Sequence, residues 1–368
     1  MTTSSSTTRL LTLDAMRGLA ALLVVVYHLE EELHLAPRGY LAVDFFFLLS
    51  GVVIARTYTP RLERGLGIRG FMTERLIRLY PFVLLGVLIG AARRVGQLLI
   101  HHPQQMPWPD LLVALPFNLA MLPTPLPGYG LFPTDGPIWS LFFELVVNAL
   151  YAGFLIRLRS PQLLGLVLLM GAGMVALFAG REQIAGGPDW AALHIGLLRS
   201  GFAFSLGVLM SRQLPAGAPR VSALWWLPCV AIVAVLMVRP PAGYGGLYDL
   251  SMALAGFPLL VWFAARRNPA PAFRGAASVL GDISYPIYAL HYPPMFIAAY
   301  AARKFGLPPM LWIPVFIGGM AVISHGLARS YDPALRAWLS SRLQTARSST
   351  SNSRVALGGI TPPAPRAP

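Results

Sequence analysis

Apolar residues recur along the chain in ten blocks of about twenty residues, and a helix of that length crosses the roughly 30 Å hydrocarbon core of a bilayer. Gly and Pro inside several blocks are compatible with membrane helices, because neighbouring helices satisfy the backbone groups that these residues free. The pattern therefore predicts an all-α fold, a polytopic transmembrane helical bundle of about ten spans. The predicted spans are 10–30, 40–58, 76–97, 138–158, 161–180, 192–211, 222–239, 247–265, 283–302 and 308–330.

A further apolar block, residues 111–122, is too short to cross a bilayer. Pro116 interrupts the block and Pro123 follows it, and the whole block lies within the long connection 98–137. We predict an interfacial or re-entrant segment at this place.

The two ends of the chain lack apolar periodicity. Residues 1–9 and 339–368 are rich in Ser, Thr, Pro and Arg, a composition typical of segments that bury too little apolar surface to fold. We predict a short cytoplasmic tail over 1–9, one transmembrane domain over 10–338, and a disordered cytoplasmic tail over 339–368.

The composition excludes a soluble globular protein. The 368 residues are 55% hydrophobic and 12% charged, whereas about 25% of the residues in an ordinary soluble domain are charged. The single cysteine, Cys229, excludes an internal disulfide framework and a multi-cysteine metal site. We expect no bound metal.

The net charge of +14 is explained by orientation in the bilayer. If the N-terminus is cytoplasmic, the predicted inner segments hold 20 basic residues and the outer segments hold 7. Because basic loops stay on the cytoplasmic side, this distribution predicts that both termini are cytoplasmic. Nucleic acid is not needed to explain the basic excess, so we expect the lipid bilayer as a partner and no nucleic acid.

The first predicted span carries Arg17 and His28, which are eleven residues apart. On a helix this spacing brings the two side chains to within about 20° of the same direction over a rise of about 16 Å, and Asp14 extends the same face. Ionisable groups at membrane depth are costly and usually functional. The alternative is that Asp14 and Arg17 are interfacial anchors and that His28 is an interior histidine. We take Arg17 and His28 as catalytic candidates.

Polar residues also mark the second and fourth predicted spans. Asp44 opens the second span and is either functional or an outer-interface residue. Ser140 and Glu144 are spaced by four residues and belong to one polar ribbon on the fourth span. Glu144 either forms a buried ion pair with an arginine such as Arg17 or Arg199, or orients a catalytic histidine.

Arg75 and Arg78 point the same way at the start of the third span. Planar guanidinium groups suit phosphates, so the two residues either bind a nucleotide-bearing donor or anchor the span at the cytoplasmic surface. In the ninth span, Ser284, Tyr288 and His291 share a face that supports a site, contacts an acceptor, or forms an interior hydrogen-bond seam. The substrate-binding candidates are Asp44, Ser140, Tyr288 and His291.

These residues leave more than one class of protein open. In a transporter, Arg17, Glu144 and His28 would form a substrate or proton pathway. A non-catalytic membrane scaffold would leave the aligned polar residues without explanation. Thioester cleavage by the purified protein separates an enzyme from a carrier.

Six motifs, in this order, resemble those of the integral-membrane acyltransferase 3 family: LDAMRGLAALLVVVYH, VDFFFLLSGVVIA, FMTERLIRLYP, PIWSLFFEL, ISYPIYALHYP and SYDPALRAW. The resemblance covers about residues 10–338. The last motif departs from the family's usual Glu-Pro because Asp332 stands at the glutamate position, a change that keeps the charge.

The resemblance implies an O-acyltransferase that moves an acyl group, commonly acetyl from acetyl-CoA, to a hydroxyl group. The acceptor would be a sugar, glycolipid or polysaccharide, or alternatively a macrolide-type small molecule. It also implies that the first-span arginine and histidine, here Arg17 and His28, are essential. We expect acyl-CoA as a donor substrate without a permanently bound cofactor, a bacterial-type cytoplasmic membrane as the location, and a stand-alone member without an added hydrolase domain.

We predict that acyl-CoA docks from the cytoplasm with its phosphates near Arg75 and Arg78. His28 then removes the proton of the acceptor hydroxyl as a general base, and Glu144 orients the imidazole. Arg17 stabilises developing negative charge or holds the donor. A covalent acyl-histidine relay is an alternative route.

Overall fold

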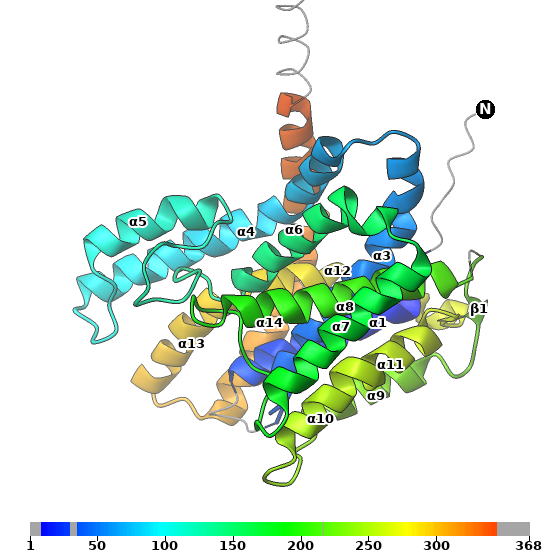
Figure 1. Cartoon of the computed structure of the whole chain (residues 1–368). Helices are drawn as coiled ribbons and strands as arrows, with labels where there is room; N and C mark the ends of the chain where they lie inside the picture. The colour runs from blue at the N-terminus through cyan, green and yellow to red at the C-terminus, as the bar shows by residue number, and fades with distance from the viewer. Residues whose placement is uncertain (1–8, 30–34, 216, 344–368) are drawn as a thin grey trace, which may run out of the picture.

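The computed structural model describes residues 9–29, 35–215 and 217–343. These residues form a bundle of helices (Figure 1), with one parallel pairing between β1 (Arg220–Val221) and β2 (Arg267–Asn268). The all-α class is therefore confirmed. The helices are α1 (Leu11–His28), α3 (Ala42–Glu63), α4 (Ile68–Leu99), α5 (Trp108–Leu119), α6 (Ile138–Gly153), α7 (Ser160–Phe178), α8 (Leu193–Gln213), α9 (Trp226–Met237), α10 (Gly245–Ser251), α11 (Phe257–Ala264), α12 (Arg274–Leu290), α13 (Tyr292–Lys304) and α14 (Pro309–Arg329).

Several helices are long and apolar enough to cross a membrane, which makes the chain an integral multi-pass membrane protein. α6 and α9 are apolar but shorter, with 16 and 12 residues. The ten spans and the cytoplasmic placement of both termini stay predictions. In the described ranges, the seven segments of sufficient length are 11–28, 39–63, 68–99, 160–178, 193–213, 245–264 and 309–343.

The ninth predicted span, 283–302, is not one helix. α12 ends at Leu290 and α13 begins at Tyr292, so that His291 lies at the junction. Pro293 lies in the first turn of α13. Proline suits a first turn because the N–H that it lacks would be unpaired there, whereas it breaks a helix interior. The predicted span 283–302 therefore corresponds to parts of two helices that meet at His291, and its crossing of the membrane stays a prediction.

The predicted boundary between the membrane domain and the C-terminal tail, at 338, falls inside a helical stretch and stays a prediction. Helical structure continues beyond α14 over residues 331–343, past the predicted end of the domain at 338. The guanidinium of Arg342 lies 5.5 Å from the ring centroid of Trp338, a cation–π contact on this extension. The predictions for 1–8 and 344–368 fall outside the described residues.

Glycines allow α1 and α12 to approach closely. A Cβ atom on Gly18 would lie 2.4 Å from the carbonyl oxygen of Leu280, and one on Gly281 would lie 2.7 Å from Cβ of Asp14. Small residues at helix crossings permit this approach in membrane bundles. As a result, α12 lies along the face of α1 that carries Asp14 and Arg17.

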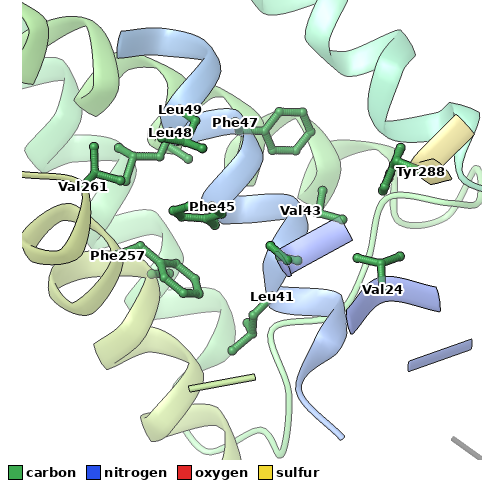
Figure 2. Packing of buried hydrophobic residues seen from close by; sticks show 14 of the residues in the cluster. Val24, Leu41, Val43, Phe45, Phe47, Leu48, Leu49, Phe257, Val261 and Tyr288 are labelled. Carbon is green, nitrogen blue, oxygen red and sulfur yellow. The ribbon is translucent and has the colours of Figure 1, made fainter. Parts of the chain in front are cut away.

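A large cluster of buried apolar side chains surrounds α3 (Figure 2). Phe45 of α3 packs against Phe257 of α11, with ring centroids 5.7 Å apart. On another face α3 meets α8, where a Cβ on Gly51 would lie 3.0 Å from Cα of Gly207. This packing fixes α3 in the bundle and so positions Phe46, which borders the site described below.

The short block predicted over 111–122 forms α5, which packs against α4 at one side of the bundle (Figure 1). The connection after α5 is held to α5 by a hydrogen bond of 2.7 Å, which Asn118 Oδ1 accepts from the Thr134 hydroxyl. It also returns to α4, because a Cβ on Gly90 of α4 would lie 2.0 Å from the Thr134 carbonyl oxygen. At twelve residues α5 is too short to span, while its depth in the membrane stays a prediction.

Candidate active site

A cavity of about 1240 Å³ lies between α1, α3, α4, α6 and α12. Eight arginines and four carboxylates line it, so its wall carries an excess of positive charge. Guanidinium groups of this kind bind phosphates and carboxylates in a planar, two-pronged geometry. The charged lining residues are Arg9, Asp14, Arg17, Arg56, Arg75, Arg78, Glu144, Arg212, Asp282, Arg329, Asp332 and Arg336.

Arg17 extends from α1 into this cavity and against α12. Its Nε donates to the Ser284 hydroxyl at 2.8 Å, and Nη2 donates to the Gly281 carbonyl at 3.1 Å. Nη2 also lies 3.2 Å from the carboxylate of Asp14, which in turn pairs with Arg9 at 2.7 Å. Arg17 is therefore a cation held in one orientation on the cavity wall.

Glu144 of α6 lines the same cavity and is paired with Arg75 of α4. Its Oε1 accepts hydrogen bonds from Arg75 Nη2 at 2.6 Å and from the Ser50 hydroxyl at 2.9 Å. The Arg75 side chain is 6% exposed, so the pair is largely desolvated. Glu144 thus forms a buried ion pair, but its partner is neither Arg17 nor Arg199.

Phe46, Ser140 and Tyr288 line the cavity next to the turn of α12 that ends at His291, and we name these three side chains the partition. The Tyr288 and Ser140 hydroxyls are 2.6 Å apart and hydrogen-bonded, and the Phe46 ring stands edge-on to the Tyr288 ring at 5.5 Å. All three line the cavity, whereas His291, one turn after Tyr288, does not. The Tyr288 and His291 ring centroids are 6.2 Å apart, so one side chain of the cavity wall lies next to His291.

His28 and His291 meet beyond the partition, where the end of α1 faces the junction of α12 and α13. His28 Nδ1 lies 3.2 Å from His291 Nε2 and 2.9 Å from the Val24 carbonyl oxygen. The Tyr292 ring packs edge-on against His28 with centroids 5.0 Å apart. The first-span histidine therefore faces the interior of the bundle and is bonded to a second imidazole.

The structure thus divides the predicted site residues between two neighbouring places. No contact between Glu144 and His28 occurs among the described residues, and the orienting role predicted for Glu144 has no geometric support. The imidazole partner of His28 is instead His291, which we predicted as a substrate-binding residue. The predicted residues on the cavity wall are Arg17, Arg75, Arg78, Ser140, Glu144 and Tyr288.

Asp44 is not among the residues that line the cavity. Its two carboxylate oxygens accept hydrogen bonds from Arg199 Nε at 3.0 Å and Nη2 at 2.6 Å, and both side chains are 3% exposed. Arg199 also donates to the Gly186 carbonyl at 2.8 Å. This geometry ties α3 to α8, and it offers no support for the predicted substrate-binding role of Asp44.

Sequence reasoning missed Asp135, which lies in the loop just before α6. Its side chain is fully buried, and neither carboxylate oxygen has a hydrogen-bond partner within the described ranges. A Cβ on Gly86 would lie 2.3 Å from Asp135 Oδ2, which places the carboxyl against α4. Burial raises the pKa of Asp135 well above its usual range, and the charge of Arg93 offsets part of that shift. The sequence signal was an acidic residue two positions before the PIWSLFFEL motif.

The helical bundle and this site define a multi-pass membrane protein with a cationic cavity next to a pair of imidazoles. The chain matches the family described as "Acyltransferase domain" over residues 10–329, and it belongs to that family. It is therefore a membrane acyltransferase, as the resemblance of its motifs implied.

The similar curated proteins include two that are named for an activity. The peptidoglycan O-acetyltransferase OatA of Listeria monocytogenes is 26% identical over 325 residues, which cover 76% of this chain and 48% of that protein. The putative peptidoglycan O-acetyltransferase YrhL of Bacillus subtilis is 24% identical over 337 residues, which cover 82% of this chain and 50% of that protein. The chain thus spans about half the length of both relatives.

A third relative, "Protein 2 in picA locus" of Rhizobium radiobacter, is 36% identical over 186 residues. The alignment covers 48% of this chain and 96% of that protein. No solved structure matches the chain.

Proposed function

We propose that this acyltransferase moves an acyl group, most simply acetyl, from acyl-CoA to a hydroxyl of a sugar, glycolipid or polysaccharide in a bacterial-type cytoplasmic membrane. The observation that carries the proposal is the arginine-rich cavity, one of whose lining residues, Tyr288, lies next to His291 of the His28–His291 pair. The names of the relatives from Listeria and Bacillus support an acetyl donor and a glycan acceptor.

The cavity supplies the binding site for the donor. Acyl-CoA carries several phosphates at one end and a thioester at the end of a flexible arm, so it needs cations at the entrance and a path toward the reactive group. Arg75 is neutralised by Glu144, and Arg336 pairs with Asp332 at 2.7 Å. Arg78 is the residue that we assign to the phosphates, with Arg75 acting as its structural support.

The histidine pair supplies the chemistry. His28 takes the proton from the acceptor hydroxyl while the hydroxyl oxygen bonds to the thioester carbonyl carbon. The carbon–sulfur bond then breaks, and the thiolate of CoA leaves and recovers the proton from His28. The products are an O-acyl ester and free CoA, and no further reactant is required.

Arg17 acts between the two places. Its guanidinium lies on the cavity wall at the level of Ser284, one turn of α12 before Tyr288. A fixed cation there holds the arm of the donor or stabilises negative charge that develops on the carbonyl oxygen. For the attack at His28, the thioester end of the donor must pass the partition, so the hydrogen bond between Ser140 and Tyr288 must open during each reaction cycle.

The test uses the purified protein in lipid nanodiscs, acetyl-CoA with an isotopic label in the acetyl group, and a chitin pentasaccharide as the probe acceptor. We expect labelled acetyl ester on the sugar together with an equal amount of free CoA. The His194→Ala variant is a matched control, because His194 is exposed on α8 and is not among the cavity-lining residues.

Two results would contradict the proposal. The first is an absence of labelled ester on the pentasaccharide and on glycolipid extracts offered in its place, with protein that is folded by size-exclusion chromatography. The second is entry of acetyl-CoA or sugar into sealed proteoliposomes without thioester cleavage, which would identify a carrier.

A further inference from the structure

We propose that His291 is a positioning residue that, together with the Val24 carbonyl, holds the proton of His28 on Nδ1, so that the reacting atom of the enzyme is Nε2 of His28. The catalytic consequence rests on the acyl transfer proposed above. The tautomer itself follows from hydrogen bonds within the chain.

The protonation of His291 is set by the helix junction in which it lies. Its Nδ1 is 2.8 Å from the Tyr288 carbonyl oxygen and 3.0 Å from the Ile287 carbonyl oxygen. A carbonyl oxygen can only accept a hydrogen bond, so Nδ1 must carry the proton. In the neutral imidazole, Nε2 of His291 is then the nitrogen with the lone pair.

The protonation of His28 follows in the same way. Its Nδ1 is 2.9 Å from the Val24 carbonyl oxygen, one turn earlier on α1, and therefore also carries a proton. The same N–H lies 3.2 Å from Nε2 of His291, which is free to accept it. Three carbonyl groups thus leave one consistent assignment for both rings, with each proton on Nδ1.

This assignment decides which nitrogen of His28 can react. Nδ1 is used in the bonds to Val24 and His291, and Nε2 keeps the lone pair that a base or a nucleophile requires. When Nε2 takes the proton of the acceptor hydroxyl, Nδ1–H still donates to His291, which steadies the charged ring during the reaction. His291 therefore takes the role predicted for Glu144, which is to orient the imidazole of His28.

The direct test is solid-state NMR of the full chain in lipid bilayers, labelled with ¹⁵N in its 7 histidines and observed without substrate. We expect a protonated Nδ1 and an unprotonated Nε2 for both His28 and His291, each assigned by the signal lost in its single alanine variant. A proton on Nε2 of either ring in the neutral form overturns the proposal. Because no substrate is present, this result is independent of whether the enzyme acylates a glycan.

A pair of substitutions tests the catalytic consequence. Gln places an acceptor where Nε2 of histidine stands, whereas Asn reproduces only the position of Nδ1. We expect kcat of His291→Gln to stay within about 10-fold of the unchanged protein and kcat of His291→Asn to fall about 100-fold, with KM for acetyl-CoA unchanged in both. Equal losses in the two variants would show that His291 only fills space, and would overturn the positioning role.

Discussion

The two polar regions on either side of the partition are built differently. Around the cavity, charged side chains form ion pairs, such as Arg75 with Glu144 and Arg17 with Asp14. Around His28, the partners are a backbone carbonyl and a neutral imidazole. Fixed charges suit the binding of an anionic donor, whereas a neutral ring held by carbonyls suits a group that gains and loses a proton. The comparison supports the proposed division, with binding in the first region and chemistry in the second.

The largest effect should come from the histidine region. Replacing His28 by Ala removes the base and should lower kcat about 100- to 10,000-fold, because proton transfer by a placed side chain contributes about 10²–10⁴. The measurement is release of CoA thiol by the purified variant at saturating acetyl-CoA. His194→Ala, on the exposed side of α8, should keep full activity. Full activity in His28→Ala would contradict the placement of the chemistry in the histidine region.

The next effect concerns stability in the cavity region. Replacing Glu144 by Gln leaves the buried Arg75 charge without its partner, which should cost about 3–5 kcal/mol of unfolding free energy. The double variant Arg75→Gln/Glu144→Gln should recover a large part of that loss, because neither charge is left alone. Thermal unfolding of the single and double variants in detergent measures the coupling. Additive losses would show that the pair does not act as a unit.

A smaller effect is expected from the residue assigned to the donor phosphates. Replacing Arg78 by Gln should raise KM for acetyl-CoA about 10-fold, because one charge-assisted hydrogen bond is lost. The same substitution should leave kcat within a factor of about two. Steady-state kinetics at several salt concentrations measures this change, which should shrink at high salt because salt weakens the attraction between Arg78 and the phosphates in the unchanged protein. An unchanged KM would show that other arginines of the cavity wall bind the phosphates.

The smallest effect should come from the partition itself. Replacing Tyr288 by Phe removes one hydroxyl, while the Ser140 hydroxyl keeps its bond of 3.0 Å to the Pro137 carbonyl oxygen. The expected loss of unfolding free energy is about 1 kcal/mol, the usual net value of a single hydrogen bond. Thermal unfolding compared with Tyr244→Phe, a substitution at an exposed position directly before α10, measures it. A loss several times larger would mean that the bundle needs the Tyr288 hydroxyl for its packing.

Much of the helical pattern was predictable, because long apolar blocks in a membrane rarely form anything other than helices. The face shared by Arg17 and His28 was also predictable, since it depends only on the period of one helix. The break at His291 was not recognised, although the Pro293 that causes it is visible in the sequence. Proline inside membrane helices is common enough that its presence alone does not predict a break.

The partners of the site residues could not be predicted. Arg75 and Glu144 are 69 positions apart, and His28 and His291 are 263 positions apart. Periodicity shows which way a side chain points on its own helix, but not which helix it faces. That choice depends on how the helices pack, here on the glycines that bring α1 against α12.

The most direct test of the division between binding and chemistry is the affinity of the His28→Ala variant for a thioether analogue of acetyl-CoA that cannot transfer its acyl group. Isothermal titration calorimetry on the variant in nanodiscs gives this value without any turnover. The account predicts the same Kd as for the unchanged protein, because the donor is held on the far side of the partition from His28. A loss of binding as large as the loss of turnover would contradict it.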